Sequence, residues 1–150
     1  MTFDKKIDFL KSIGSDKVPH SSFFEKKTLL DHLIGTHDIL QGWGKEQIVL
    51  DAGLFHSVYG TAKFMPNKGL VDNRQVIIDL IGDQAEEIVY WFCILVFPRI
   101  PEMEKFKDPL KSYLLAVERA NALEQKDFQD RLKEYNAKKN IMTWEEAYDL

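Results

Sequence analysis

Cysteine is almost missing from this chain, which has a single one, Cys93, among its 150 residues. One thiol excludes an internal disulfide and any cysteine-rich zinc site. Cys93 lies inside the apolar and aromatic run 90–95, where a thiol is buried and away from the cations that activate nucleophilic cysteines. We therefore predict a buried, inert thiol.

Long apolar segments and an excess of positive charge are missing too. The most apolar run, residues 88–97, is about half as long as a helix that crosses a bilayer, and the first residues lack the apolar core of a signal peptide. The chain has 20 basic and 24 acidic residues and a net charge of −4, which disfavours a nucleic-acid partner. We expect a cytoplasmic protein with neither a membrane nor a nucleic-acid partner; a homo-oligomer stays open.

Strand-like alternation, internal repeats and several common catalytic signatures are also absent. The chain contains no phosphate-binding glycine loop, no nucleophile elbow and no basic helix-turn-helix. Apolar residues instead recur at helical spacing nearly everywhere. A chain of this length forms one ordinary domain, so the sequence predicts an all-α, single-domain bundle of six or seven helices over residues 1–150.

Turn and capping residues set the expected boundaries of these helices. Gly14 is placed to end an N-terminal helix within residues 1–14, and Asp83 resembles the cap of a helix at 84–97. The charged second half of the long helix, residues 124–139, is predicted to project into solvent. The other expected segments are helices at 28–41, 45–59, 73–81 and 109–135, loops at 15–27 and 60–69, and a C-terminal tail at 136–150 with a short helical turn near 143.

Two histidines, His32 and His56, lie in apolar stretches of two consecutive expected helices. An imidazole there is costly unless it finds a hydrogen bond or a metal. The short turn at residues 42–44 makes the two helices antiparallel neighbours, so the rings can meet across the seam. The small residues Ala52 and Gly53, one turn before His56, leave room for close approach of another helix or a ligand. Two imidazoles suit zinc, iron or manganese.

The sequence around these histidines resembles the HD-domain superfamily. Its helical metal-dependent hydrolases and oxygenases bind their metal with a His, a His-Asp pair and a distant Asp. The stretch 53–61, Gly-Leu-Phe-His-Ser-Val-Tyr-Gly-Thr, is closest to a family of small, uncharacterised HD-like proteins. The resemblance implies an HD-like bundle around one pocket. Ser57 stands where the superfamily has its metal-bridging Asp.

A later stretch, residues 116–121, resembles the helix that carries the superfamily's last Asp, although it has no Asp. Glu118 and Asn121 lie one turn apart, and either fills that position. The expected ligands are His32, His56 and Glu118 around one divalent ion (Zn, Fe or Mn). Because two of the four superfamily positions are changed, a site without metal is the alternative.

Other residues around the expected pocket have chemistry of their own. The dipeptide His37-Asp38 falls where the superfamily has no ligand, so a surface or helix-packing role is expected. The predicted catalytic residues are the ones that donate or accept protons: His56, Tyr59, Glu118 and the loop residue His20. The predicted substrate contacts are the polar ones: Ser57, Thr61, Arg74 and Asn121, with an ion pair as the alternative for Arg74.

These features favour a small enzyme, a hydrolase or lyase that acts on a small polar metabolite, assisted by a metal at His32 and His56. Because Ser57 replaces a ligand, the competing hypothesis is a non-catalytic HD-like protein that binds a ligand or a partner. A metal-dependent oxygenase is a further alternative, although that branch uses more His and Asp ligands than this chain has.

Overall fold

The computed structural model describes residues 1–19, 27–60, 71–96 and 98–126, and these residues form an all-α bundle without a strand. This confirms the predicted fold class and the expected number of helices. The seven helices of the described residues are α1 (Phe3–Ser12), α2 (Leu29–Gly42), α3 (Gln47–Phe55), α4 (Arg74–Ile81), α5 (Asp83–Ile94), α6 (Ile100–Met103) and α7 (Leu110–Glu124).

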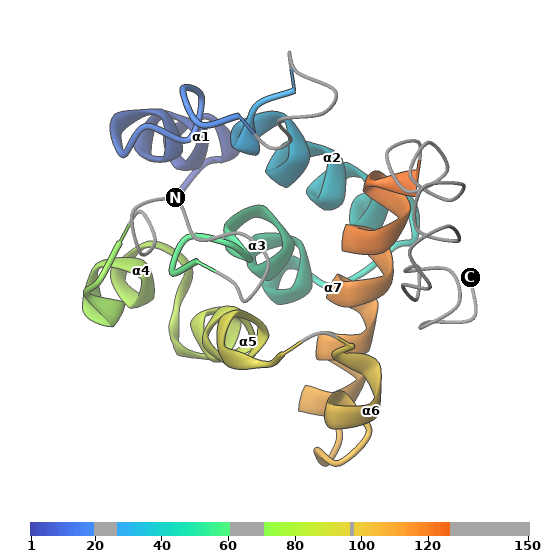
Figure 1. The fold of residues 1–150 in the computed structure, drawn as a ribbon. Coiled ribbons are helices and arrows are strands. Elements are labelled where there is room, and N and C mark those ends of the chain that lie inside the picture. The colour runs from blue at the N-terminus through green and yellow to red at the C-terminus, as the bar shows by residue number, and fades with distance from the viewer. Residues whose placement is uncertain (20–26, 61–70, 97, 127–150) are drawn as a thin grey trace.

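Helix α3 lies at the centre of the bundle, between α2 on one side and α5 on the other, and α7 crosses beside all three (Figure 1). Each of these four helices gives fully buried side chains to one shared core, among them Leu33, Leu54, Val89 and Val117. Within the described ranges, no helix is both long and apolar enough to cross a membrane. The central position of α3 brings its last residues close to both α2 and α7.

The packing of α2 against α3 depends on small residues and a defined helix start. Thr28 and Asp31 form a capping box that fixes where α2 begins. A Cβ on Gly53 would overlap Cδ1 of buried Leu40 on α2, so any larger residue would require Leu40 to shift within the core. The prediction that Gly53 makes room for a neighbouring helix is confirmed.

Helix α3 ends one turn earlier than expected, and this changes the site. His56 is the C-cap of α3 and Tyr59 lies in the turn that follows, whereas both were predicted on the helix. His32 lies in the first turn of α2. The two histidines still meet, because the start of one antiparallel helix packs against the end of the other.

Other boundaries also differ from the expected ones. Helix α5 begins at Asp83 itself, with Gly82 as its cap, and ends at Ile94 instead of residue 97. The short α6, which carries Pro101 in its first turn, was not predicted. Helix α7 ends at Glu124, and the expected continuation to 135, the tail at 136–150 and the turn near 143 fall beyond residue 126, outside the described residues.

Candidate functional site

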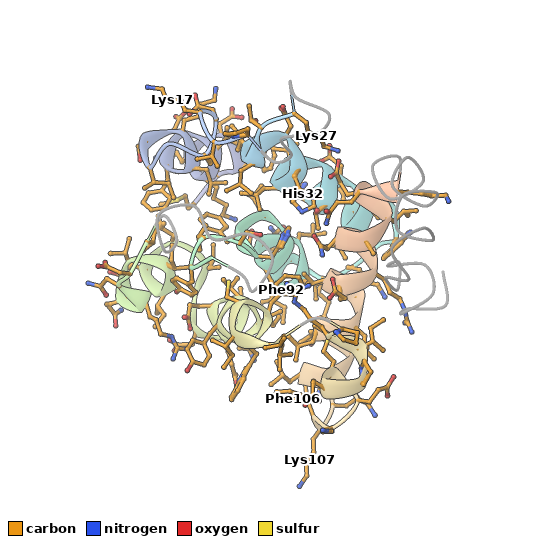
Figure 2. The ribbon with its side chains drawn as sticks, in the orientation of Figure 1. Lys17, Lys27, His32, Phe92, Phe106 and Lys107 are labelled. Carbon is orange, nitrogen blue, oxygen red and sulfur yellow. The ribbon has the colours of Figure 1, made fainter. Side chains whose placement is uncertain are left out.

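Two imidazoles and one amide oxygen converge where α2, α3 and α7 meet. His32 Nε2 lies 3.1 Å from His56 Nε2 and 2.8 Å from Asn121 Oδ1, and His56 Nε2 lies 3.2 Å from the same oxygen. All three side chains are at least 97% buried, with exposed fractions of 1%, 1% and 3%. Figure 2 shows His32 on the side of α2 that faces α7. The predicted meeting of the two histidines is confirmed.

The other nitrogen of His32 contacts a carboxylate at the end of α7. His32 Nδ1 lies 2.5 Å from Glu124 Oε1, and Lys27 forms an ion pair with the second oxygen, Oε2. A carboxylate paired with a lysine is ionised and only accepts hydrogen bonds. His32 Nδ1 therefore carries a proton and donates a hydrogen bond to Glu124, so Nε2 faces the centre.

The other nitrogen of His56 is fixed by the backbone of α3. His56 Nδ1 donates to the carbonyl of Gly53 over 2.7 Å, and a carbonyl can only accept. The backbone oxygen of His56 accepts from the Cys93 thiol at 3.0 Å, and the Phe92 ring packs edge-on against the imidazole. These contacts set the orientation of the ring and direct Nε2 to the centre.

Asn121 is oriented by a chain of buried charges. Its Nδ2 donates to Glu118 Oε1 at 2.7 Å, and Glu118 Oε2 accepts from Arg99 at 3.0 Å. The guanidinium of Arg99 also lies over the Phe92 ring. Because the amide nitrogen is held by Glu118, the amide oxygen is the atom that faces His32 and His56.

This arrangement directs three electron-pair donors at one point. If each histidine carries a proton on Nδ1 only, both Nε2 atoms and Asn121 Oδ1 present lone pairs to one another at 2.8–3.2 Å. Gln125 Nε2 also donates to Asn121 Oδ1 at 3.0 Å, but the two Nε2 atoms still repel each other and this oxygen unless a positive charge lies among them. An additional proton on one Nε2 or a metal ion satisfies this requirement.

The spacing of these donors also fits a single metal ion. Metal–nitrogen bonds are about 2.1 Å, so two ligands at right angles in an octahedral site are about 3.0 Å apart, whereas tetrahedral zinc ligands are about 3.4 Å apart. The hydrogen-bond partners on Nδ1 of both rings are of the kind that fixes metal-binding histidines. In the described part of the chain no three His, Cys, Asp or Glu side chains gather as metal ligands, and the third polar atom at this centre is the amide oxygen of Asn121. The predicted ligand Glu118 instead orients Asn121.

Tyr59 and Arg74 belong to a different cluster. The Tyr59 hydroxyl donates to Glu86 at 2.8 Å, and Arg74 donates to both oxygens of the same carboxylate at 2.6 and 2.8 Å. Burial and the hydrogen bond to Glu86 raise the pKa of the Tyr59 phenol above its ordinary value of 10.0. The predicted donor and the predicted substrate-binding arginine thus make an ion-pair cluster between α4, α5 and the turn after α3.

The remaining predicted residues have mixed outcomes. Ser57 is buried directly after His56, and no hydrogen bond of its hydroxyl to the two imidazoles is found among the described residues. His20 and Thr61 lie outside the described residues. His37 is buried and stacks on Phe3 at 4.7 Å, which confirms the helix-packing role. The His37 ring lies apart from His32 and His56 and does not belong to the candidate site.

Two residues around the centre were not anticipated. Glu124 was predicted in a solvent-exposed segment, and Arg99 lies between two expected helices, at 84–97 and 109–135. The signal for Glu124 was its spacing, because residues 117, 121 and 124 share one face of a helix. Arg99 had no local signal, since its burial depends on how α6 packs against α7.

The fold and the site define an all-α protein with a buried polar centre of two imidazoles and one amide. Residues 9–96 match a family described as a domain of unknown function (DUF6817), and the chain belongs to this family. No curated protein and no solved structure matches the chain. The matched stretch includes His32 and His56, whereas Asn121, Glu118 and Glu124 come from beyond it.

Proposed function

We propose that this chain is a small HD-like enzyme of the hydrolase or lyase type, in which His32, His56 and Asn121 hold one divalent metal ion. The observation that carries the proposal is the convergence of three lone-pair donors within 3.2 Å, with both imidazoles turned by hydrogen bonds on Nδ1. Zinc, iron and manganese all accept imidazole ligands.

The residues around the ligands supply orientation and a dry environment. Gly53 O and Glu124 hold the two imidazoles, and Glu118 holds the amide. A bound ion would lower the pKa of a coordinated water or polarise a substrate oxygen. Burial of the centre strengthens such electrostatic effects, because the effective dielectric constant falls away from water.

The charge of the ligand set bears on the substrate. Two neutral imidazoles and one neutral amide leave the charge of a divalent ion uncompensated at its ligands. Such an ion attracts an anionic or strongly polar oxygen, as found in carboxylates and phosphates. This supports a small polar metabolite that bears oxygen ligands as the substrate.

Metal content and affinity test the proposal directly. Purified protein would be analysed for metals and titrated with Zn²⁺ and Co²⁺ against a chelator. His32→Ala, His56→Ala and Asn121→Ala should each abolish tight binding. His37→Ala is the matched control, because His37 is also a buried histidine on α2 but lies outside the pair.

Ser57→Asp extends the same test to the position where HD proteins have an aspartate. A carboxylate next to His56 should raise metal affinity if this position also faces the centre. If the wild type and Ser57→Asp both bind no more metal than His56→Ala, the metalloenzyme hypothesis is wrong.

A non-catalytic, ligand-binding relative is the second candidate, and one observation favours it. The position after His56 carries a buried serine, and the carboxylate of Glu118 is engaged by Arg99 and Asn121 rather than turned to the centre. In that case a proton shared by the imidazoles stabilises the core. A metabolite screen with His56→Ala as the blank would then show binding without turnover.

A further inference from the structure

Glu124 is placed unusually for a carboxylate at the last residue of a helix. Its side chain is 11% exposed and reaches back between α2 and α7, where Oε1 contacts His32 Nδ1. Lys27, just before α2, binds its Oε2 and also donates to its backbone carbonyl at 3.3 Å. Glu124 therefore joins the end of α7 to the start of α2 through the imidazole of His32.

The α2 backbone is shaped to admit this carboxylate. A Cβ built on Gly35 would lie 2.9 Å from both Cγ and Oε2 of Glu124 and 3.1 Å from Cδ. The two distances of 2.9 Å are shorter than Cβ atoms show in proteins, so a side chain at position 35 would require the Glu124 side chain to shift. Gly35 is one turn after His32 on the same helix, so the space left by the missing side chain of Gly35 lies beside the imidazole.

We infer that Glu124 is a positioning residue that keeps the proton of His32 on Nδ1 and so reserves Nε2 as a metal ligand, with Gly35 and Lys27 holding it in place. This inference rests on the proposed metal centre for its function, although the position of the proton can be measured without metal. Carboxylates that orient a metal-binding histidine in this way change metal affinity when they are replaced.

Lys27 makes the role of Glu124 testable with a conservative change. In Glu124→Gln, the ammonium of Lys27 can only donate, so it attracts the amide oxygen of the new side chain. The amide nitrogen then faces His32 Nδ1, which must become an acceptor. The proton moves to Nε2, and the lone pair that would bind a metal is lost.

The experiment uses the metal-free, ¹⁵N-labelled chain and NMR of the imidazole nitrogens, at a pH where the shifts show neutral rings. Wild-type His32 should carry its proton on Nδ1, and Glu124→Gln should carry it on Nε2. Lys27→Met in the Glu124→Gln background removes the ammonium, so the amide can turn its oxygen to Nδ1 and restore the original tautomer.

Metal titration gives the second readout. Glu124→Gln should weaken the binding of Co²⁺ and Zn²⁺ about 10–100-fold, and the double variant should recover part of it. Glu86→Gln is the control. Glu86, like Glu124, is a buried carboxylate paired with a cation, here Arg74, but it contacts neither imidazole. Gly35→Ala displaces the carboxylate without changing charge, so it should weaken binding even if Glu124→Gln folds poorly.

The outcomes separate this inference from the proposed function. Protonation of wild-type His32 on Nε2, or an unchanged tautomer and affinity in both Glu124→Gln and Gly35→Ala, overturns the role of Glu124. If the tautomers change as expected but the wild type binds no metal, the metal centre is wrong and the control of His32 by Glu124 stands.

Discussion

Buried charged side chains of this protein are joined in pairs and short chains of hydrogen bonds. Arg99 and Glu118 are 2% and 0% exposed, and Lys6 and Asp51 form a similar pair at 2.7 Å. A buried charge is tolerated only when a partner compensates for the lost hydration. At the residue scale, each substitution near the centre therefore also affects the partner that it leaves behind.

Replacement of Arg99 by methionine tests this directly. The change leaves Glu118 buried without its cation, so we expect the free energy of unfolding to fall by about 3–5 kcal/mol. Urea unfolding followed by circular dichroism measures it. Arg99→Lys keeps the charge and should cost less; equal losses for both variants would contradict the ion-pair explanation.

The reactivity of Cys93 is a second test at this scale. The thiol is buried against His56, and burial raises its pKa to about 12. At pH 8 almost no thiolate is present, so we expect the folded protein to resist disulfide reagents and the urea-unfolded protein to react at once. Fast labelling of the native protein would show that the sulfur is exposed by local opening.

At the scale of helices, close approach at glycine determines the geometry of the centre. Gly53 allows α3 to lie against Leu40 of α2, and Gly35 admits Glu124 of α7 between the helices. Both glycines lie within one turn of a histidine of the pair. The spacing of α2, α3 and α7 therefore sets the distances among the three donors.

Gly53→Ala should destabilise the protein although alanine is the better helix former. The new methyl group overlaps Leu40, and overpacking of a core costs about 1–3 kcal/mol. Gly42→Ala is the matched control, because a Cβ there meets nothing within 4 Å and should gain up to about 1 kcal/mol. Thermal unfolding of both variants would show opposite shifts; a stabilised Gly53→Ala would contradict the close packing.

The burial of Tyr59 and its hydrogen bond to Glu86 should make the stability of the fold depend on pH in the alkaline range. Because the pKa of Tyr59 is raised in the folded state, the folded chain holds a proton that the unfolded chain releases above pH 10. The free energy of unfolding should therefore fall as pH rises beyond 10. Spectrophotometric titration should show one late-ionising phenol fewer in Tyr59→Phe than in the wild type, since the pKa of Tyr113 is also raised by its hydrogen bond to Glu46; an equal number in both proteins would refute the assignment.

At the scale of the whole molecule, the proposed metal would join helices from distant parts of the chain. His32, His56 and Asn121 are contributed by α2, the end of α3 and α7. A ligand that binds all three favours the folded state, since the unfolded chain offers no such site. Metal binding and folding stability should therefore change together.

Zn²⁺ at one hundred times its Kd should raise the free energy of unfolding by about 2.7 kcal/mol. The effect should be largest near pH 8 and disappear toward pH 5, because protons compete with the metal for the imidazoles. Thermal unfolding with and without Zn²⁺ measures both. His37→Ala should keep the stabilisation and His56→Ala should lose it; a gain in His56→Ala would place the metal elsewhere.

The sequence by itself determined the all-α class, the approximate positions of the described helices other than α6, the burial of Cys93 and the meeting of His32 with His56. These features follow from local information: apolar periodicity, capping residues, and a turn too short to let α2 and α3 separate. The two histidines were predicted to meet although α3 was expected to end at residue 59 and ends at Phe55. In an antiparallel pair, residue 56 lies near the start of α2 with either end of α3.

Only the tertiary structure decided which partner each side chain has. Glu118 and Asn121 lie one turn apart, and the crossing of α7 over α2 and α3 turned the amide, not the carboxylate, to the histidines. Because α3 ends early, Tyr59 lies in the following turn and donates to Glu86. Glu124 is buried because Gly35 has no side chain that would occupy the same space. Such choices depend on distances between helices that are far apart in sequence, and local periodicity carries no information about them.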